Sequence, residues 1–289
     1  MTAGVVGAGL MGAEIALVFA LAGHDVLLHD RSAEALDRAI ERLRGVLDKG
    51  VVRGSHAREA ADAALARIAP VTSLDAMRGC TIVTEAVYES LEAKGDVLRA
   101  LDRICAPSCI FATNTSTLPI SSLAALLTPA RRAQFLGTHY FSPVSRMPLV
   151  EVISGFATDP AIAEQVTMRM RGIGKQPVHV RDVAGFAVNR MLHALLIEAV
   201  KLVEEGVATP ADLDTACRLG LGHPIGPFAM MDVVTSDLCL QVQEILHDAY
   251  GERFRPPALL KQRVAAGLGG GRGRPGWIDR DTGHEGSAG

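Results

Sequence analysis

The sequence has no excess of one charge. Among its 289 residues, Lys and Arg number 29 and Asp and Glu number 32, which gives a formal net charge of -3. No block of basic residues is long enough to form a patch for a polyanion. We therefore expect no nucleic acid partner and no attraction to an anionic membrane surface.

Cysteine patterns typical of metal or redox sites are also missing. The five cysteines form neither a CxxC pair nor the Cys and His spacing of a zinc site. The first residues lack the charged and apolar stretches of a secretory signal, so we expect a reduced protein in the cytoplasm. No apolar run approaches the length of about 20 residues that a membrane-spanning helix needs, so we expect no membrane segment.

Apolar residues are plentiful, at 48% of the chain. A chain of this length forms one large domain or two moderate ones, and this composition is sufficient to bury a substantial core. The sequence therefore predicts a compact globular protein.

A glycine motif stands near the start of the chain, between a short apolar run and a helical pattern. It reads G-A-G-L-M-G from Gly7 to Gly12. In such a turn the first glycine permits the tight bend, Gly9 lets the backbone approach a diphosphate, and Gly12 lets the helix pack closely. The motif alone is also compatible with a structural turn, but its context favours a dinucleotide site that includes Leu10 and Met11.

An acidic residue follows the next predicted strand, Val26–Leu28. Asp30 is placed to accept hydrogen bonds from the adenosine ribose hydroxyls and to repel a 2′-phosphate, which predicts NAD as the cofactor. The neighbouring Arg31 leaves NADP as the alternative.

Strand and helix patterns alternate through the first part of the chain. Strands are predicted at Ile68–Val71, Thr81–Val87 and Ile110–Ala112, with a helix at Ser90–Cys105. This order predicts an α/β fold with a doubly wound parallel sheet. A helical arm is predicted from two further helices, Ser32–Gly50 and Ala57–Arg67.

Several polar residues follow these strands and are expected at the cofactor end of the sheet. They are Glu89, Lys94 and the T-N-T-S-T segment Thr113–Thr117. Loops at the carboxyl ends of parallel strands line the ligand crevice. Ordinary turn chemistry is the alternative explanation for the hydroxyl cluster. Lys49, near the bend of the arm, is either a phosphate contact or part of a solvated basic face.

The segment Gly137–Ile153 contains a histidine and a glutamate on two apolar strand-like runs separated by a proline turn. Glu151 lies in an apolar strand, where an unpaired carboxylate costs several kcal/mol to bury, and His139 is the nearest candidate partner. A carboxylate bonded to one imidazole nitrogen leaves the other nitrogen to exchange protons near neutral pH. The alternative is a structural histidine with Glu151 reaching solvent.

The pattern becomes entirely helical after a last predicted strand, and we place the domain boundary near Asp182. Helices are predicted at Ala187–Glu205, Pro210–Leu219 and Phe228–Tyr250. Asn189 and His193 share the apolar face of the first of these helices. Asn189 needs a partner in a core network or in a ligand, whereas His193 is more typical of a core histidine. The glycine-rich segment Gly267–Gly289 is expected to be mobile at its end.

Five motifs together resemble the L-3-hydroxyacyl-CoA dehydrogenase family, over nearly the whole chain and in matching order. They are the glycine motif, Asn114 to Ser116, H-Y-F-S-P at His139 to Pro143, E-V-I at Glu151 to Ile153, and G-F-A-V-N-R at Gly185 to Arg190.

The resemblance implies a Rossmann-type domain that binds NAD, residues 1–182, and a helical substrate and dimerisation domain, residues 183–289. It implies an acyl-CoA substrate of the 3-hydroxybutyryl-CoA type and a homodimer formed through the second domain. A dehydrogenase of a free hydroxy acid and a non-catalytic NAD-binding protein are the alternatives.

The resemblance also implies a role for each matching residue. His139 would be the acid/base and Glu151 its orienting carboxylate, while Ser116 and Asn189 would contact the substrate and Lys49 the CoA. Glu89, Lys94, Asn114 and Ser142 would lie along the cofactor. At Ser142 the family more often has Asn, and the C-terminal signature ending at Trp277 is degraded.

Overall fold

The computed structural model describes residues 1–278, and the chain divides into two compact units, Met1–Phe186 and Ala187–Gly289. We expected the boundary near Asp182. The first unit extends four residues further, to Phe186, and contains Asp182 as expected; the two carboxylate oxygens of Asp182 accept hydrogen bonds from the backbone N–H groups of Ile120 and Ser121.

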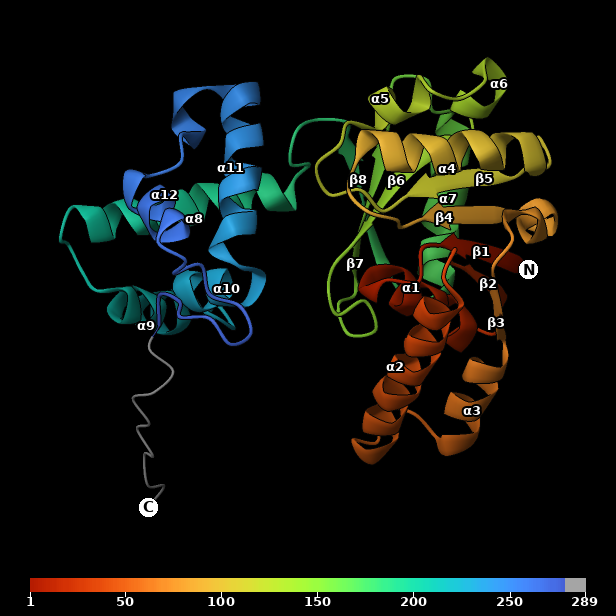
Figure 1. The fold of residues 1–289 in the computed structure, drawn as a ribbon, viewed down its shortest axis with the longest axis horizontal. Helices are drawn as coiled ribbons and strands as arrows, with labels where there is room; N and C mark the ends of the chain where they lie inside the picture. The colour runs from red at the N-terminus through yellow and green to blue at the C-terminus, as the bar shows by residue number, and fades with distance from the viewer. Residues whose placement is uncertain (279–289) are drawn as a thin grey trace. The chain divides into compact units, whose positions relative to one another are not determined.

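The first unit contains an eight-stranded sheet in the order β3-β2-β1-β4-β5-β6-β7-β8 (Figure 1). The strands are β1 Thr2–Val6, β2 Asp25–His29, β3 Ile68–Val71, β4 Ile82–Glu85, β5 Ile110–Thr113, β6 Phe135–Tyr140, β7 Leu149–Ser154 and β8 Gln176–Arg181. This is the doubly wound Rossmann-type order, in which the chain starts at a central strand and builds outward in both directions.

One strand departs from the parallel arrangement that we expected. β7 pairs antiparallel with β6, whereas every other neighbouring pair is parallel. Only the turn of residues 141–148 separates β6 from β7, and a parallel return would need a crossover of a dozen or more residues. The antiparallel pairing places His139 directly opposite Glu151.

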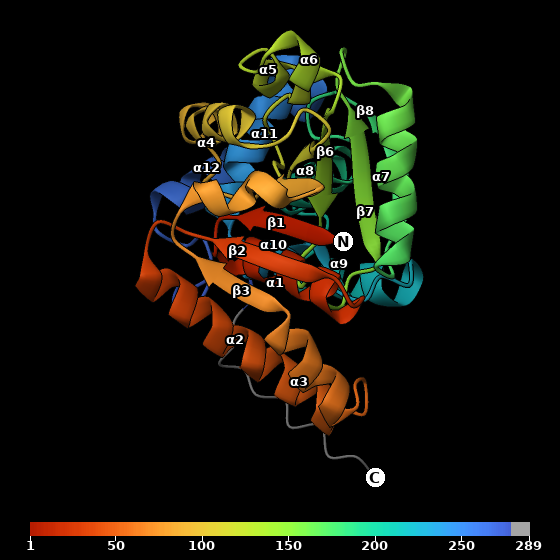
Figure 2. The same ribbon diagram turned by 90° about the vertical axis from the view of Figure 1, so that its right-hand side faces the viewer.

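Helices cover both faces of this sheet. They are α1 Leu10–Leu21, α2 Ala33–Val52, α3 Arg58–Ala66, α4 Leu91–Ile104, α5 Ile120–Ala124, α6 Pro129–Arg132 and α7 Pro160–Gly172, with a 3₁₀ turn at Leu74–Gly79. Figure 2 shows α2 and α3 side by side next to β3, as the predicted arm. Side chains of Ser32, Ser90 and Asp159 cap the first turns of α2, α4 and α7.

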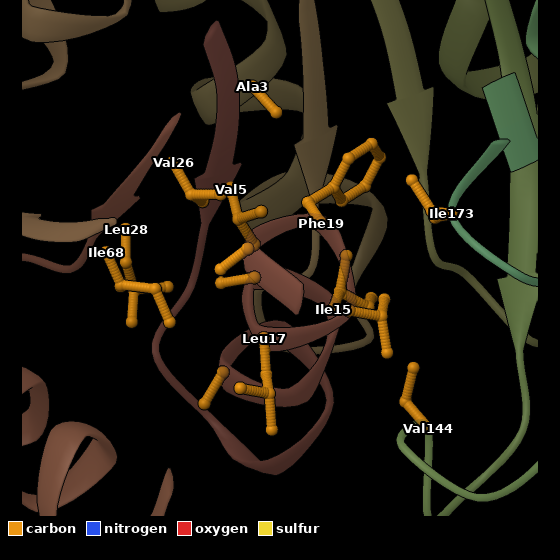
Figure 3. Packing of buried hydrophobic residues seen from close by; sticks show 14 of the residues in the cluster. Ala3, Val5, Ile15, Leu17, Phe19, Val26, Leu28, Ile68, Val144 and Ile173 are labelled. Atoms are coloured by element: carbon orange, nitrogen blue, oxygen red, sulfur yellow. The ribbon is translucent and has the colours of Figure 1, made fainter. Parts of the chain in front are cut away.

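Two apolar clusters fill the space between the sheet and these helices. The cluster under α1, α2, α3 and α7 contains Ile15, Leu17 and Phe19 of α1 together with Val5 and Leu28 of the sheet (Figure 3). The second cluster lies on the opposite face, under α4 and α5. Side chains alternate along each strand, so neighbouring residues of β1 or β6 enter different clusters.

The second unit is helical, as predicted. Its helices are α8 Val188–Glu204, α9 Pro210–Gly220, α10 Pro227–Val234, α11 Ser236–Tyr250 and α12 Ala258–Ala265, with a 3₁₀ turn at Glu252–Phe254. The single helix expected over Phe228–Tyr250 was wrong. It breaks at Thr235, whose φ of 78° lies in the region that favours glycine. After the break, the N–H of Ser236 donates to the carbonyl of Gly269.

The segment that follows α12 is anchored by Trp277. The indole N–H donates to Ser236 Oγ at 2.8 Å, and Asp232 accepts from the backbone N–H groups of Trp277 and Ile278. The mobile end that we expected falls in residues 279–289, outside the described residues. Among residues 1–278, no helix is long and apolar enough to cross a membrane.

Candidate active site

His139 and Glu151 form a buried pair across β6 and β7. Nδ1 of His139 lies 2.8 Å from Oε2 of Glu151, and the two residues are 6% and 1% exposed. The alternative that Glu151 reaches solvent was therefore wrong. With Nδ1 held by the carboxylate, Nε2 is the nitrogen that can exchange a proton with a ligand.

Two aromatic rings flank the imidazole of His139. The ring centroids of Phe141 and Phe186 lie 4.6 and 5.7 Å from that of His139, both tilted. Phe186 is buried and has a φ of 48°, an uncommon left-handed conformation for a bulky residue. Apolar walls of this kind exclude water from the imidazole and strengthen its electrostatic interactions. Phe186 belongs to the motif Gly185 to Arg190, but no role was predicted for it from the sequence.

A buried lysine lies between two acidic residues at the end of β4. Nζ of Lys94 is 2.9 Å from Oε1 of Glu85 and 3.2 Å from Oε2 of Glu89, and it also donates to the carbonyl of Val87. Glu85, 0% exposed, also accepts from the hydroxyl of Thr113. These contacts occupy the ammonium group of Lys94, so Lys94 is placed to support the loop that contains Val87 and Glu89. Glu85 was not predicted as a site residue, although a carboxylate at the end of an apolar strand indicates a buried partner.

Glu89 organises the turn that contains Ser116. Its Oε1 accepts from the hydroxyls of Thr115 and Thr117 and from the backbone N–H groups of Ser116 and Thr117, at 2.6 to 3.0 Å. Burial works to raise the pKa of Glu89, but the charge of Lys94 and these hydrogen bonds outweigh it and lower the pKa. The carboxylate therefore remains ionised and fixes the backbone at Ser116.

Asn114 connects this turn to the strand that contains His139. Its side-chain oxygen accepts from the backbone N–H of Tyr140 at 3.0 Å, and its own backbone N–H donates to the carbonyl of Glu85. The amide nitrogen of Asn114 is then the side-chain atom that can donate to a ligand. The structure thus brings Asn114 beside β6, the strand that contains His139.

The glycine turn has the shape that a diphosphate requires. A Cβ at Gly12 would lie 1.9 Å from the carbonyl oxygen of Gly7, and Gly7 has a φ of 107°. A Cβ at Gly9 would meet nothing within 4 Å, which indicates open space above the turn. Leu10 and Met11 form the first turn of α1, whose N–H groups and dipole attract an anion. The turn therefore fits a dinucleotide.

Asp30 holds the glycine turn against β2. Its Oδ2 accepts from the backbone N–H of Ala8 at 2.9 Å, and its Oδ1 accepts from the N–H of Ser32 at 3.1 Å. These bonds orient the carboxylate beside the turn, where its remaining lone pairs can accept from ribose hydroxyls.

Arg42 of α2 is a further residue at this turn, and the sequence did not predict it. Its Nη2 donates to the carbonyls of Ala8 and Gly9 at 3.1 and 3.3 Å. In a trans peptide the N–H points opposite to the C=O, so Arg42 turns the N–H groups of Gly9 and Leu10 to the other side of the turn. The sequence could not predict this contact, because Arg42 looks like any other basic residue on the polar face of an amphipathic helix.

Three further residues that we expected to contact ligands come from other elements. Lys49 is exposed near the end of α2, and Ser142 is exposed in the turn after β6. Asn189 lies in the first turn of α8, in the second unit. His193 is buried there as a core histidine, and burial lowers its pKa to about 4. Within residues 1–278 no cluster of His, Cys, Asp and Glu could hold a metal ion.

Comparisons with known proteins agree with this geometry. Residues 2–183 match the family model described as 3-hydroxyacyl-CoA dehydrogenase, NAD binding domain, and residues 185–279 match its C-terminal domain. A probable 3-hydroxybutyryl-CoA dehydrogenase of Deinococcus radiodurans is 40% identical over 272 residues, which cover 93% of this chain and 96% of the relative.

Two solved structures are also similar. An (S)-3-hydroxybutyryl-CoA dehydrogenase from Ralstonia eutropha has a TM-score of 0.91 and 36% identity, covering 95% of this chain and 97% of the other. A 5-formyl-3-hydroxy-2-methylpyridine 4-carboxylic acid 5-dehydrogenase, an NAD+ dependent dismutase, has a TM-score of 0.76 and 32% identity, covering 96% and 90%. The chain therefore belongs to the 3-hydroxyacyl-CoA dehydrogenase family, as its motifs predict, and is an NAD-dependent enzyme of that family.

Proposed function

We propose that the enzyme oxidises a short-chain (S)-3-hydroxyacyl-CoA, of the 3-hydroxybutyryl-CoA type, reversibly to the 3-ketoacyl-CoA. The observation that supports this most strongly is the buried His139 and Glu151 pair, since a protein that only bound a dinucleotide would have no use for it. The names of the similar proteins support the short chain length.

In the proposed reaction His139 takes the proton of the substrate's 3-hydroxyl group through Nε2. NAD supplies the hydride acceptor when it is bound. Glu151 fixes the tautomer of His139 and stabilises the imidazolium that forms. In reduction the proton returns from Nε2 to the 3-oxygen. General acid/base catalysis of this kind contributes roughly 10²–10⁴-fold to the rate.

Ser116 and Asn189 are the proposed partners of the substrate's 3-oxygen and thioester region. Hydroxyl and amide donors suit a developing oxyanion, and the bonds from the Ser116 backbone to Glu89 preorganise that turn. Lys49 is the proposed contact to the CoA phosphates, as an exposed cation on α2.

The proposed NAD site comprises Gly7, Gly9, Leu10, Met11, Gly12, Asp30, Glu89, Lys94, Asn114 and Ser142. The glycine turn and the start of α1 bind the diphosphate, and Asp30 accepts from the adenosine ribose. Lys94 acts in this proposal through Glu85 and Glu89, which occupy its ammonium group.

The test is NADH consumption with acetoacetyl-CoA, run beside acetoacetate and beside NADPH. We expect rapid loss of NADH with the thioester and little with the free acid or with NADPH. Equal rates with acetoacetate would favour the free hydroxy acid, the second candidate, which the similarity to a dehydrogenase of a free carboxylic acid supports. Binding of NADH without turnover on any acyl-CoA would contradict the catalytic proposal.

We further propose a homodimer formed through the helical unit and a reducing, cytoplasmic setting. Large apolar side chains, among them Leu219, Leu221 and Val233, are exposed on that unit, as expected of a surface that pairs with another copy. All five cysteines are free thiols, four of them buried.

A further inference from the structure

Helix α1 contains one acidic residue that the proposed reaction does not use. Glu14 lies among apolar residues in the first half of the helix and is 5% exposed. Burial of a carboxylate costs several kcal/mol unless hydrogen bonds compensate. The bonds come from one residue: Oε2 of Glu14 accepts from the backbone N–H of Ser145 at 2.9 Å and from its hydroxyl at 3.2 Å.

A second buried charge meets the same turn from another element. Nζ of Lys175, a residue 7% exposed just before β8, donates to the carbonyl of Met147 at 2.8 Å and to that of Val144. Burial lowers the pKa of Lys175, and the charge of Glu14 opposes this shift. The anion therefore holds N–H and O–H donors of the turn, and the cation holds its carbonyls.

Apolar packing contributes little else to the position of this turn. Val144 is buried and lies near Ile15 of α1 (Figure 3), but residues 145–148 are exposed or half-buried. Ser145 and Lys175 also border a hollow of about 330 Å³ beside α1. Ser145 faces this hollow, so its bonds to Glu14 hold the middle of the turn on a side where apolar packing is sparse.

The turn continues directly from the proposed catalytic strand. Phe141, whose ring packs against the imidazole of His139, and Ser142 are its first residues. A displacement of the turn would therefore move the Phe141 ring relative to the imidazole of His139, and Ser142 with it. A misplacement of about 1 Å at a reacting group can cost about 100-fold in rate.

We propose that Glu14 and Lys175 are positioning residues that fix the 141–148 turn to α1, and so hold Phe141 and Ser142 in register with His139. This inference rests on the proposed function. It makes the helix that binds the diphosphate a support of the catalytic strand as well.

The experiment compares Glu14→Gln with Glu14→Asp, using kcat for acetoacetyl-CoA reduction and the Kd of NADH. Gln keeps an oxygen that can accept from Ser145, whereas Asp keeps the charge but is one methylene too short. We expect Gln to retain kcat within about threefold and Asp to lose about tenfold, a loss of about 1.4 kcal/mol in transition-state stabilisation. The Kd of NADH should change less than about threefold in both.

Titration with NADH counts folded sites, so that kcat refers to folded enzyme alone. Ser145→Ala tests the contact from the other side: it should lower kcat by itself a few-fold and cause no further loss in the Glu14→Asp background. Glu41→Ala, on the exposed face of α2, is the control and should behave as wild type.

Three results would overturn the inference. They are wild-type kcat in Glu14→Asp, a higher kcat in Asp than in Gln, and additive losses from Glu14→Asp and Ser145→Ala. Failure of the wild-type enzyme itself to reduce acetoacetyl-CoA would instead contradict the proposed function, and the two failures are thereby distinguished.

Discussion

At the scale of single residues, polar contacts to the backbone organise the site more than contacts between side chains. Glu89, Asp30 and Arg42 each bond two or more backbone groups of a loop. Such bonds fix the direction of loop N–H groups before a ligand arrives, which reduces the ordering that binding requires. The pair of His139 and Glu151 and the ion pairs of Lys94 are contacts between side chains.

Replacement of His139 by Gln tests the acid/base role. Gln can still hydrogen-bond but cannot take up a proton, so we expect kcat to fall by roughly 10²–10⁴-fold. The Kd of NADH should stay within about threefold of wild type, because the glycine turn is untouched. Steady-state kinetics and fluorescence titration measure the two quantities, and near-normal turnover would rule out the assignment.

Replacement of Arg42 by Gln tests the support of the glycine turn. The guanidinium is half-buried, and loss of its charge-assisted bonds should raise the Kd of NADH by about three- to tenfold. At saturating NADH, kcat should change by less than about twofold. Arg44→Gln on the same helix removes an exposed charge paired with Glu41 and serves as the control. Equal affinities of the two variants would contradict the role of Arg42.

At the scale of elements, irregular points separate helices that the pattern alone would join or extend. The break between α10 and α11 is one, because the bonds of Asp232 and Ser236 to Trp277 hold the chain there. Elements far apart in sequence thus decide where a helix ends, whatever its own apolar periodicity.

Thr235→Gly tests the strain at that break. Glycine adopts a φ of 78° freely, and this relief outweighs the loss of the bond from the Leu238 N–H to the Thr235 hydroxyl, so we expect the free energy of unfolding to rise by about 1 kcal/mol. Thr235→Ala keeps the strain and loses the bond from the Leu238 N–H to the Thr235 hydroxyl, and should lower stability by about 1 kcal/mol. Urea denaturation compares the variants, and a Gly variant less stable than the Ala variant would disprove the strain.

His193 in α8 should make the enzyme less stable in acid. Burial lowers its pKa to about 4, so between pH 6.5 and 4 the unfolded chain binds a proton that the native state does not. The contribution to the free energy of unfolding therefore falls by about 2 kcal/mol from pH 7 to pH 5. His193→Leu should lose this part of the pH dependence in urea denaturation, and an unchanged dependence would show that other groups cause it.

At the scale of the whole molecule, the two units differ in the size of their buried apolar clusters. In the first unit the sheet buries an apolar cluster on each face. The helical unit has a smaller cluster, and both units leave large apolar side chains in contact with solvent. Exposed apolar area of this kind is stabilised when another surface covers it.

The proposed homodimer would have a mass of about twice 30.5 kDa in light scattering. Leu219 and Leu221 at the end of α9 are 81% and 64% exposed, and their joint replacement by Glu should shift the mass toward the monomer. Val52→Glu changes a side chain of the first unit that is 86% exposed and should leave the mass unchanged. A wild-type monomer at micromolar concentration would contradict the dimer.

Much of this protein can be predicted from its sequence. The glycine turn, the alternation of strands and helices, and the pairing of His139 with Glu151 depend on local spacing and on residues close in the chain. Local rules of backbone conformation and burial therefore suffice for them. The five ordered motifs also identified the family.

Tertiary structure alone decided the contacts that join distant segments. Glu14 meets Ser145, and Arg42 meets the glycine turn, because the sheet order brings α1, α2 and the 141–148 turn together. No local sequence pattern predicts these contacts, since a charged residue among apolar residues in a helix indicates only that it needs a partner. The identity of that partner depends on packing of the whole unit, a property of the folded chain.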